Sequence, residues 1–527
     1  MLAWIRNASR KPCVRCVAST AKRAGNGTLA GVAIVLLALA AVLTMAPARS
    51  AAVTLTGERQ LILINLTGGL PGRWESCRAI CASGEQPRTL LGPAGDSPRL
   101  AWRVPGDETA TRLLDNLDYE HDVRQTAAGA TVLLTSRQPF HGIRLVHRYR
   151  FSRDGRRLSA SLQVPAGARL DLIGGPALAG EPLAGLGGLY TDEKAVVINA
   201  AGQETLGGAE RVVTDRLLPT GEWAGIRGRF WTVLLQADAP LRLDTSEPAR
   251  KAPVLSLRRD SDGSGSVELR FYGGPVAPAD LKAAAPELDS MLYAGLWPWL
   301  RALAAGLRTI LEFWQGVVGN WGLAIMLLSL SVKVLMWPLT WVAERWQADV
   351  NRQQSLLAPD LAAIRREYKG EEAHNRTLAV YRKHGISHFY ALKSLAGFLV
   401  QIPVFIAAFD MLGENFGLSG ASFLWAQNLA LTDRAVALPV MIPFFGGHLN
   451  LLPVLMTAFT ILAARLQEDA SLAPELRSAQ RLRLYGMGAL FFVLLYTFPA
   501  GMVLYWTTNN LLHLAKILVG RSRARGV

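Results

Sequence analysis

The sequence predicts an α-helical membrane protein with six transmembrane helices and one large all-β domain outside the cytoplasm. Its 527 residues are 50% hydrophobic and only 18% charged, which suits a membrane protein that carries a soluble domain. Several apolar runs are long enough to cross a bilayer. Lysine and arginine gather beside these runs and leave a net charge of +15. This placement fits membrane topology and anionic lipid better than binding to a nucleic acid.

The first apolar run, residues 29–47, predicts a transmembrane anchor that follows a cytoplasmic segment, residues 1–28. Six cations precede the run and place the amino terminus inside: Arg6, Arg10, Lys11, Arg15, Lys22 and Arg23. A cleaved signal peptide is the alternative, because Ala46-Pro-Ala48 resembles a cleavage site, but the leader is long for one. Cys13 and Cys16 form a lone Cys-x-x-Cys pair, a weak metal or redox signal, so no metal or other cofactor is expected.

The segment 50–290 predicts an external all-β sandwich. Gly, Pro, Asp and Asn separate runs that alternate or are rich in β-formers. The runs are VTLTGERQLILINL, ATVLLTSR, IRLVHRYRFS, RLSASLQV, FWTVLLQA and SVELRFY. Cys77 and Cys81 lie in this domain, where they could stay reduced or form a local disulfide.

Residues 297–314 change to a helical period and carry Arg301 and Arg308 on an otherwise apolar segment. This pattern predicts an interfacial amphipathic helix on the outer membrane face. The next apolar run, Trp321 to Val342, predicts the second crossing. Four further crossings are expected at about 395–413, 450–466, 482–498 and 501–519, so that residues 321–519 hold five helices.

The charge of the loops orients these crossings. Residues 343–394 are rich in lysine and arginine, whereas the loop from Glu414 to Asn450 carries only Arg434. Six crossings with both termini inside satisfy this bias, and the basic tail, residues 520–527, is then cytoplasmic. Residues 343–394 also have helical spacing. They predict a cytoplasmic hairpin in which Pro359 starts a second helical pattern and the chain breaks near Gly370.

Lys333 is the main candidate site residue, because it lies just past the middle of the second apolar run. A lysine deep in a membrane helix costs roughly 2.5–3.5 kcal/mol, so it usually faces water or a polar partner. The alternative is that its stem snorkels to the cytoplasmic surface. Ser329 lies beside it, and Tyr505, Trp506 and Asn509 lie in the last crossing. We expect these five side chains to line a wet groove, with ordinary polar packing between helices as the alternative.

No catalytic residue is expected. Gly417-Leu-Ser-Gly420 matches a short serine motif of intramembrane proteases, but Ser419 falls in a predicted external loop, away from a held base.

Six segments, taken in order, make the chain resemble the YidC-type membrane protein insertases of the YidC/Oxa/Alb family. They are WGLAIMLLSLSVKVLMWPLT, LAPDLAAIRREY, LVQIPVFIAAFDML, SFLWAQNLALTD, LNLLPVLM and FPAGMVLYWTTNN. The resemblance is close over about 290–520, and upstream the segments GEWAGIRGRFWTVLL and RFYGGP look like the end of the family's periplasmic domain. It implies a periplasmic β-supersandwich joined to the six crossings, in a bacterial inner membrane.

The resemblance also implies a function. The protein would be an insertase and chaperone without enzymatic activity, with nascent membrane proteins as clients and with the Sec translocon, the ribosome and membrane lipids as partners. No specific nucleic acid is expected. Two departures stand out: the family's groove usually carries arginine where Lys333 stands, and SHFYALKSLAG replaces the usual junction before the third crossing. The rival functions are a small-solute transporter, or a non-catalytic assembly factor acting through its external domain.

Overall fold

The computed structural model describes residues 52–525 except 82–85, 94–96, 154, 176–177, 179–180, 207–212, 247–252, 260–263, 384–395 and 467–473. The predicted anchor at 29–47, the signal-peptide alternative and the Cys13/Cys16 pair therefore lie outside the described residues.

The amino-terminal half forms a large β-domain, as the alternating runs predicted. Its strands are β1 (Ala52–Thr56), β2 (Gln60–Asn65), β3 (Pro71–Ser76), β4 (Arg88–Leu91), β5 (Arg99–Arg103), β6 (Tyr119–Thr126), β7 (Gly129–Ser136), β8 (Val146–Ser152), β9 (Arg157–Val164), β10 (Arg169–Ile173), β11 (Lys194–Asn199), β12 (Gly202–Leu206), β13 (Arg216–Leu218), β14 (Trp223–Arg227), β15 (Trp231–Ala237), β16 (Leu241–Ser246), β17 (Val254–Arg259) and β18 (Gly265–Pro275).

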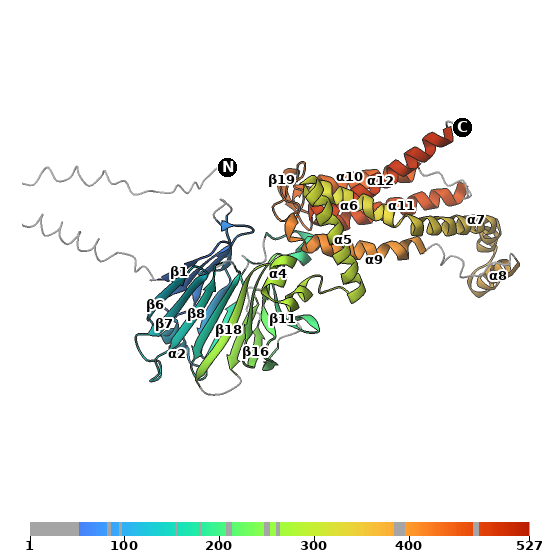
Figure 1. Ribbon diagram of the computed structural model, residues 1–527. Helices are drawn as coiled ribbons and strands as arrows, with labels where there is room; N and C mark the ends of the chain where they lie inside the picture. Colours follow the sequence, from blue (N-terminus) through green and yellow to red (C-terminus); the bar gives the residue numbers. More distant parts are fainter. Residues whose placement is uncertain are drawn as a thin grey trace, which may run out of the picture. The chain divides into compact units, whose positions relative to one another are not determined.

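These strands form three antiparallel sheets. The largest has nine strands in the order β12-β11-β14-β15-β18-β9-β8-β7-β6, and several of them are labelled side by side in Figure 1. A second sheet has the order β13-β16-β17-β10-β5, and a third is the meander β1-β2-β3-β4. Every second side chain of β9 is buried, from Leu158 to Val164. They join one core with Trp74 and Trp102 of the other sheets, which makes the domain a sandwich.

The domain is not purely β, which corrects the all-β prediction. Helix α2 (Glu108–Asp115) begins after Asp107, whose side chain accepts a hydrogen bond from Ala110 N. The short helices η2 (Gly185–Tyr190), α4 (Pro278–Ala284) and η3 (Pro286–Met291) follow later in the chain. Cys77 and Cys81 are joined by a disulfide, which settles the alternative that the sequence left open.

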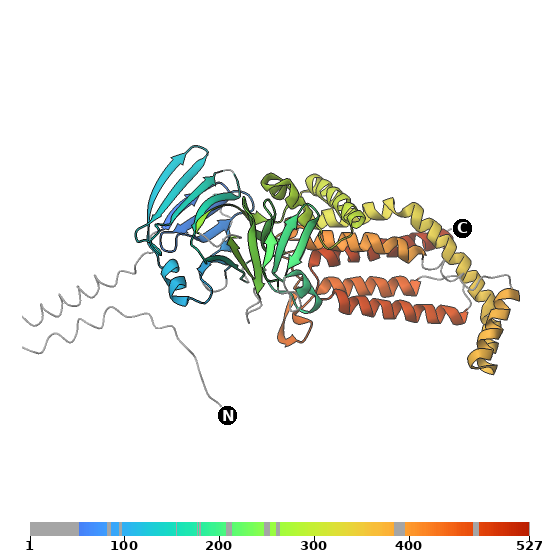
Figure 2. The ribbon, with the colours of Figure 1, turned by 90° about the horizontal axis from the view of Figure 1, so that it is seen from below.

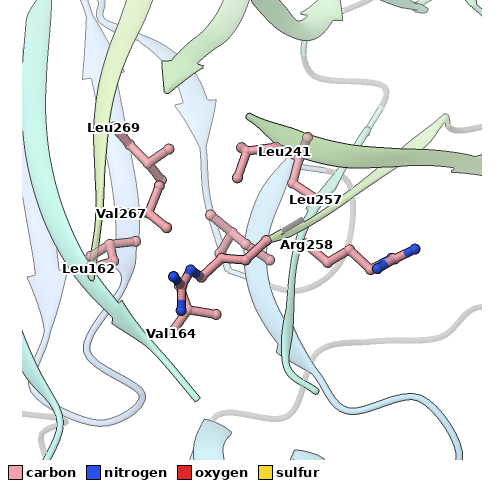
Figure 3. A pocket seen from close by; sticks show the side chains of 9 residues that line it. Leu162, Val164, Leu241, Leu257, Arg258, Val267 and Leu269 are labelled. Carbon is pink, nitrogen blue, oxygen red and sulfur yellow. The ribbon is translucent and has the colours of Figure 1, made fainter. Parts of the chain in front are cut away.

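A gap between the sheets holds no ligand-sized space. Figure 3 shows Leu162, Val164 and Val267 facing Leu241 and Leu257 across it, with Arg258 at its side. Its volume is about 20 Å³, room for about one water molecule and no more. The interior of the sandwich is therefore a packed core.

His147 is fully buried in this core as a neutral ring. Its Nδ1 accepts a hydrogen bond from Gln163 N at 3.3 Å, so its proton is on Nε2, which donates to Tyr119 Oη at 3.0 Å. Trp102 stacks on the ring with centroids 5.9 Å apart. Burial lowers the pKa of His147 to about 4.

We expect the β-domain to lose stability as the pH falls from about 6.5 to about 4. The unfolded chain binds a proton near pH 6.5 while the folded chain resists it down to pH 4, so the loss reaches about 3 kcal/mol. Hydrogen exchange of the β7–β9 amides in the full chain, corrected for intrinsic rates, measures it. His147→Gln should flatten this pH dependence, whereas the exposed control His121→Gln should keep it. An unchanged slope in His147→Gln would assign the acid sensitivity to other groups.

The carboxy-terminal half is mostly helical. Its elements are α5 (Pro298–Val318), α6 (Trp321–Leu335), α7 (Trp337–Glu367), α8 (Gly370–Lys383), α9 (Ala396–Glu414), η5 (Phe416–Leu418), the hairpin strands β19 (Val436–Ile442) and β20 (Gly446–Leu449), α10 (Leu451–Leu466), α11 (Pro474–Leu495) and α12 (Ala500–Arg525). Figures 1 and 2 both show α10, α11 and α12 running alongside one another.

The apolar run from Trp321 to Val342, predicted as the second crossing, is not a single straight helix. The run breaks at Met336 into α6 and α7, which are bent by 60°. Pro338, in the first turn of α7, explains the break, since it has no N–H to donate and its ring clashes with a preceding helical turn. Among the described residues, no single helix is long and apolar enough to cross a bilayer, but this bent pair passes by length and composition. Six crossings stay a prediction.

Pro359 does not start a helix, which is a second correction. It lies inside the 31-residue helix α7. Val350, Leu357 and Ile364 are buried and recur every seven residues on one face, so packing continues across the proline and offsets the lost hydrogen bond. The chain does break before Gly370, which has a positive φ of 65°, and α8 follows.

Candidate functional site

A cavity of about 1010 Å³ lies among α6, α7, α9 and α12. Most of its wall is apolar, with polar groups concentrated on α7 and α12. Its lining residues are Leu330, Val332, Lys333, Val334, Met336, Trp337, Thr340, Ala343, Glu344, Gln347, Gln401, Val404, Phe405, Tyr505, Trp506, Asn509, Leu512, His513, Ala515, Lys516, Val519 and Gly520. We call this cavity the groove.

Lys333 lies in the last turn of α6, not deep within a continuous helix, because α6 ends at Leu335. Its Nζ donates to Asn509 Oδ1 at 2.7 Å and to Asn509 O at 3.1 Å, so α6 and α12 meet at this contact. Within the described part of the chain Lys333 forms no ion pair. Neutral oxygens therefore hold the ammonium group, and its charge stays available to an anionic group that enters the groove.

Two polar stripes face the groove. Asn509, His513 and Lys516 follow each other on α12 at spacings of four and three residues, which puts them on one helix face. Thr340, Glu344 and Gln347 have the same spacing on α7. The stripes touch where Lys516 Nζ meets Glu344 Oε1 at 2.6 Å, a pair in which both side chains are more than half exposed.

The polar residues at the start of α12 divide into two sets. Tyr505, Trp506 and Asn509 line the groove. Thr507 and Thr508 donate instead to carbonyls of their own helix, and Asn510 donates to Thr460 Oγ1 of α10 at 2.8 Å. Ordinary polar packing, the alternative weighed for this stretch, therefore accounts for the second set.

The two serines near Lys333 contribute less to the polar lining of the groove than predicted. Ser329 is only 2% exposed and is not among the residues that line the groove. Ser331 Oγ accepts a hydrogen bond from Trp314 Nε1 of α5 at 2.9 Å, which ties it to a different helix. The prediction that Ser329 lines the groove thus does not match the cavity's lining.

Phe405 and Trp506 form part of the apolar wall of the groove. Trp506 lies between Phe405 of α9, at 4.6 Å between ring centroids, and Phe491 of α11, at 5.0 Å. The rings join three helices and offer an apolar surface beside the polar stripe.

The turn before α12 is fixed by the loop that follows η5. Ala500 N and Gly501 N, two of the donors that a helix start leaves unpaired, bond to Leu431 O at 2.6 Å and Leu429 O at 2.8 Å. This contact fixes the end of α12 from which Tyr505, Trp506 and Asn509 project.

Six polar groove residues were missed by the sequence analysis: Thr340, Glu344, Gln347, Gln401, His513 and Lys516. Glu344 and Gln347 fall in the segment assigned to the cytoplasmic hairpin. The repeated spacing of polar residues along α7 and α12 is the signal that could have found them. Among the described residues, no group of three or more His, Cys, Asp or Glu side chains could hold a metal ion.

Comparison with known proteins finds relatives of the helical part of the chain. Residues 313–525 match the model of the 60 kDa inner membrane protein family. Relatives called membrane protein insertase YidC occur in Syntrophobacter fumaroxidans, 33% identical over 48% of this chain, and in Helicobacter pylori, 30% identical over 55% of it. This helical part of the chain is similar to the YidC insertases. A YidC protein of Chlamydia trachomatis is 29% identical over 51% of this chain.

The match to these YidC relatives is partial in length. The chain covers 43% of the Syntrophobacter protein, 48% of the Helicobacter protein and 36% of the Chlamydia protein, so it spans less than half of each. A solved structure titled as an active YidC insertase aligns with 93% of this chain at 17% identity and a TM-score of 0.34, too low to add to the assignment.

Proposed function

We propose that this protein is an insertase and chaperone of the bacterial inner membrane, which guides hydrophobic segments of nascent proteins into the bilayer. The groove carries the proposal: a large cavity with an apolar wall, two polar stripes and a lysine held by neutral oxygens. Similarity to YidC proteins supports it, since the relatives matched are called membrane protein insertases. Nascent membrane proteins are the proposed clients, with the Sec translocon and the ribosome as partners.

The mechanism follows from the cost of moving polar groups into hydrocarbon. A polar or acidic segment of a client loses less hydration in a polar groove than in lipid. The Lys333 ammonium attracts a carboxylate at about 4 Å by on the order of 4 kcal/mol at an effective dielectric near 20, before desolvation costs. The client's apolar segment would leave the groove along lipid-facing surfaces of the third and fifth of six proposed crossings.

Insertion into proteoliposomes tests this function. Purified protein should promote protease-protected insertion of a single-span client with an acidic residue near its apolar segment, relative to protein-free liposomes. Release of a small solute from the same vesicles without client insertion would favour a transporter and overturn the proposal.

The ion pair between Glu344 and Lys516 is expected to slow the insertion of acidic clients. An exposed ion pair is worth up to about 1 kcal/mol, so a client carboxylate can displace Glu344 from Lys516. Glu344→Gln should therefore raise the insertion rate of acidic clients by up to about fivefold, and Lys516→Gln should lower it. Glu372→Gln, which removes a similarly exposed pair with Arg376 on α8, is the matched control. Equal rates for Glu344→Gln and this control would remove the pair from the mechanism.

A further inference from the structure

The hairpin formed by β19 and β20 exposes apolar side chains on both sides of its strands, and none of them lines the groove. The strands pair from Val436 with Leu449 to Ile442 with Gly446, with a bulge between. Six large apolar side chains are exposed on them and on their turn: Val436, Val440, Met441, Ile442, Phe444 and Leu449. Met441 is 76% exposed and Val440 67%. We call these six side chains the hairpin face.

The hairpin is fastened to the helices through its turn, through β20 and through the residues that flank it. Phe445 packs edge-on against Tyr496 with centroids 5.1 Å apart, and Tyr496 Oη donates to His448 O at 3.1 Å. Asn450 Nδ2 donates to Tyr496 O at 2.7 Å, and Asp433 Oδ2 accepts from Leu452 N at 2.6 Å at the start of α10. The hairpin thus lies at the level where α10 begins and α11 ends, and Figure 2 shows it projecting from these helix ends.

The length of α10 sets the depth of that level. The helix rises about 21 Å from Leu451 to Arg465, at about 1.5 Å per residue. The hydrocarbon core of a bilayer is about 30 Å thick. Arg465 needs the cytoplasmic surface, so Leu451 reaches no farther than the outer edge of the hydrocarbon. With Arg465 at that surface, Leu451 lies within the outer leaflet, and the adjoining hairpin lies at the depth of the outer acyl chains and headgroups.

The composition of the hairpin suits lipid. Residues 435–464 contain no Asp, Glu, Lys or Arg. Protein interfaces usually surround an apolar centre with polar groups that give specificity, whereas a lipid surface requires only apolar area and low charge.

We propose that the hairpin face is a lipid-binding surface embedded in the outer leaflet, where it anchors the external ends of α10, α11 and α12. This lipid-binding role goes beyond the proposed insertase function. It depends only on α10 lying in the membrane with Arg465 at the cytoplasmic surface.

Fluorescence in lipid nanodiscs tests this anchor. The full chain with Cys13→Ser, Cys16→Ser and Met441→Cys would carry an NBD label, since Cys77 and Cys81 are bonded to each other. We expect blue-shifted emission, quenching by lipids with a doxyl group at acyl carbon 5, and resistance to iodide. Leu217→Cys in β13, 46% exposed, is the control and should show the opposite pattern.

Two outcomes would overturn the anchor. Iodide quenching at Met441→Cys equal to that at Leu217→Cys would mean that the face lies in water. Protection from both iodide and doxyl lipid would mean that protein, such as a second copy of the chain, covers it. Val440→Cys repeats the test if Met441→Cys fails to fold. Client insertion is measured on the same labelled protein to test the two proposals separately. Normal insertion together with a water-exposed hairpin would contradict the lipid anchor and leave the insertase function standing.

Discussion

Lys333→Ala is expected to slow the insertion of clients with an acidic residue near their apolar segment by about tenfold or more. The variant removes an attraction on the order of 4 kcal/mol, of which desolvation cancels a part, and a remainder of about 1.4 kcal/mol corresponds to a factor of ten. Lys333→Arg should largely preserve insertion, because the charge remains and a guanidinium can also donate to both oxygens of Asn509. The measurement is insertion into proteoliposomes with paired clients that differ only in the acidic residue.

Lys282→Ala is the matched control, because this lysine is exposed in α4 of the β-domain and lies far along the chain from the groove. Asn509→Leu separates charge from position, since it keeps Lys333 but removes the oxygen that holds its Nζ at 2.7 Å. Its insertion rate should fall between those of wild type and Lys333→Ala. If Lys333→Ala inserts every client as fast as wild type, Lys333 only snorkels and the groove's specificity lies elsewhere.

The β-domain could be predicted from sequence because its strands carry a local signal. The run RLSASLQV alternates as β9 does, with its buried side chains at every second position. The order of strands in the sheets has no such signal, because β18 pairs with β9 across a hundred residues of intervening chain. The first and last residues of the helices were harder to predict. Hydropathy adds up apolar residues and ignores backbone geometry, so the break that Pro338 imposes at Met336 was invisible to it.

The site was predicted where a polar residue stood out against apolar neighbours, as Lys333 and Asn509 do. Glu344 and Lys516 lie among other polar residues, so hydropathy does not single them out. Only their repeated spacing along α7 and α12 could have marked them, and the structure shows them lining the groove and paired with each other. Ser329 was predicted as a groove residue from its position, but neighbouring helices bury it. Its position four residues before Lys333 puts it on the same helix face, but one turn farther from the open end, where neighbouring helices cover it.

Arg229 is the second residue for which we expect a large effect, on stability instead of insertion. It lies in the turn between β14 and β15 and is 7% exposed. Its Nε donates to Gly413 O and its Nη1 to Ala430 O, both at 2.7 Å, while its guanidinium stacks 4.5 Å from the ring of Phe230. Burial lowers the pKa of Arg229 to about 10, which leaves it charged at neutral pH.

The contact with Gly413 completes the end of α9. The last carbonyls of a helix have no partner within it and carry the negative end of its dipole, so a buried cation there stabilises the helix end. Arg227 adds an ion pair with Glu414 at 2.9 Å. These two arginines join the β-domain to α9 through its last turn, so the helix that supplies Gln401, Val404 and Phe405 to the groove depends on a residue of the β-domain.

Arg229→Met is therefore expected to destabilise the protein by about 3–5 kcal/mol, because it leaves two buried carbonyls without donors and keeps most of the side-chain volume. Thermal unfolding in detergent micelles measures the loss, and hydrogen exchange of the amides of residues 408–418 should rise before that of the β-sheet core. The exposed Arg124→Ala is the control, for which a change below about 1 kcal/mol is expected. If Arg229→Met unfolds at the wild-type temperature with protected α9 amides, water satisfies the carbonyls of Gly413 and Ala430, and the β-domain does not hold the end of α9.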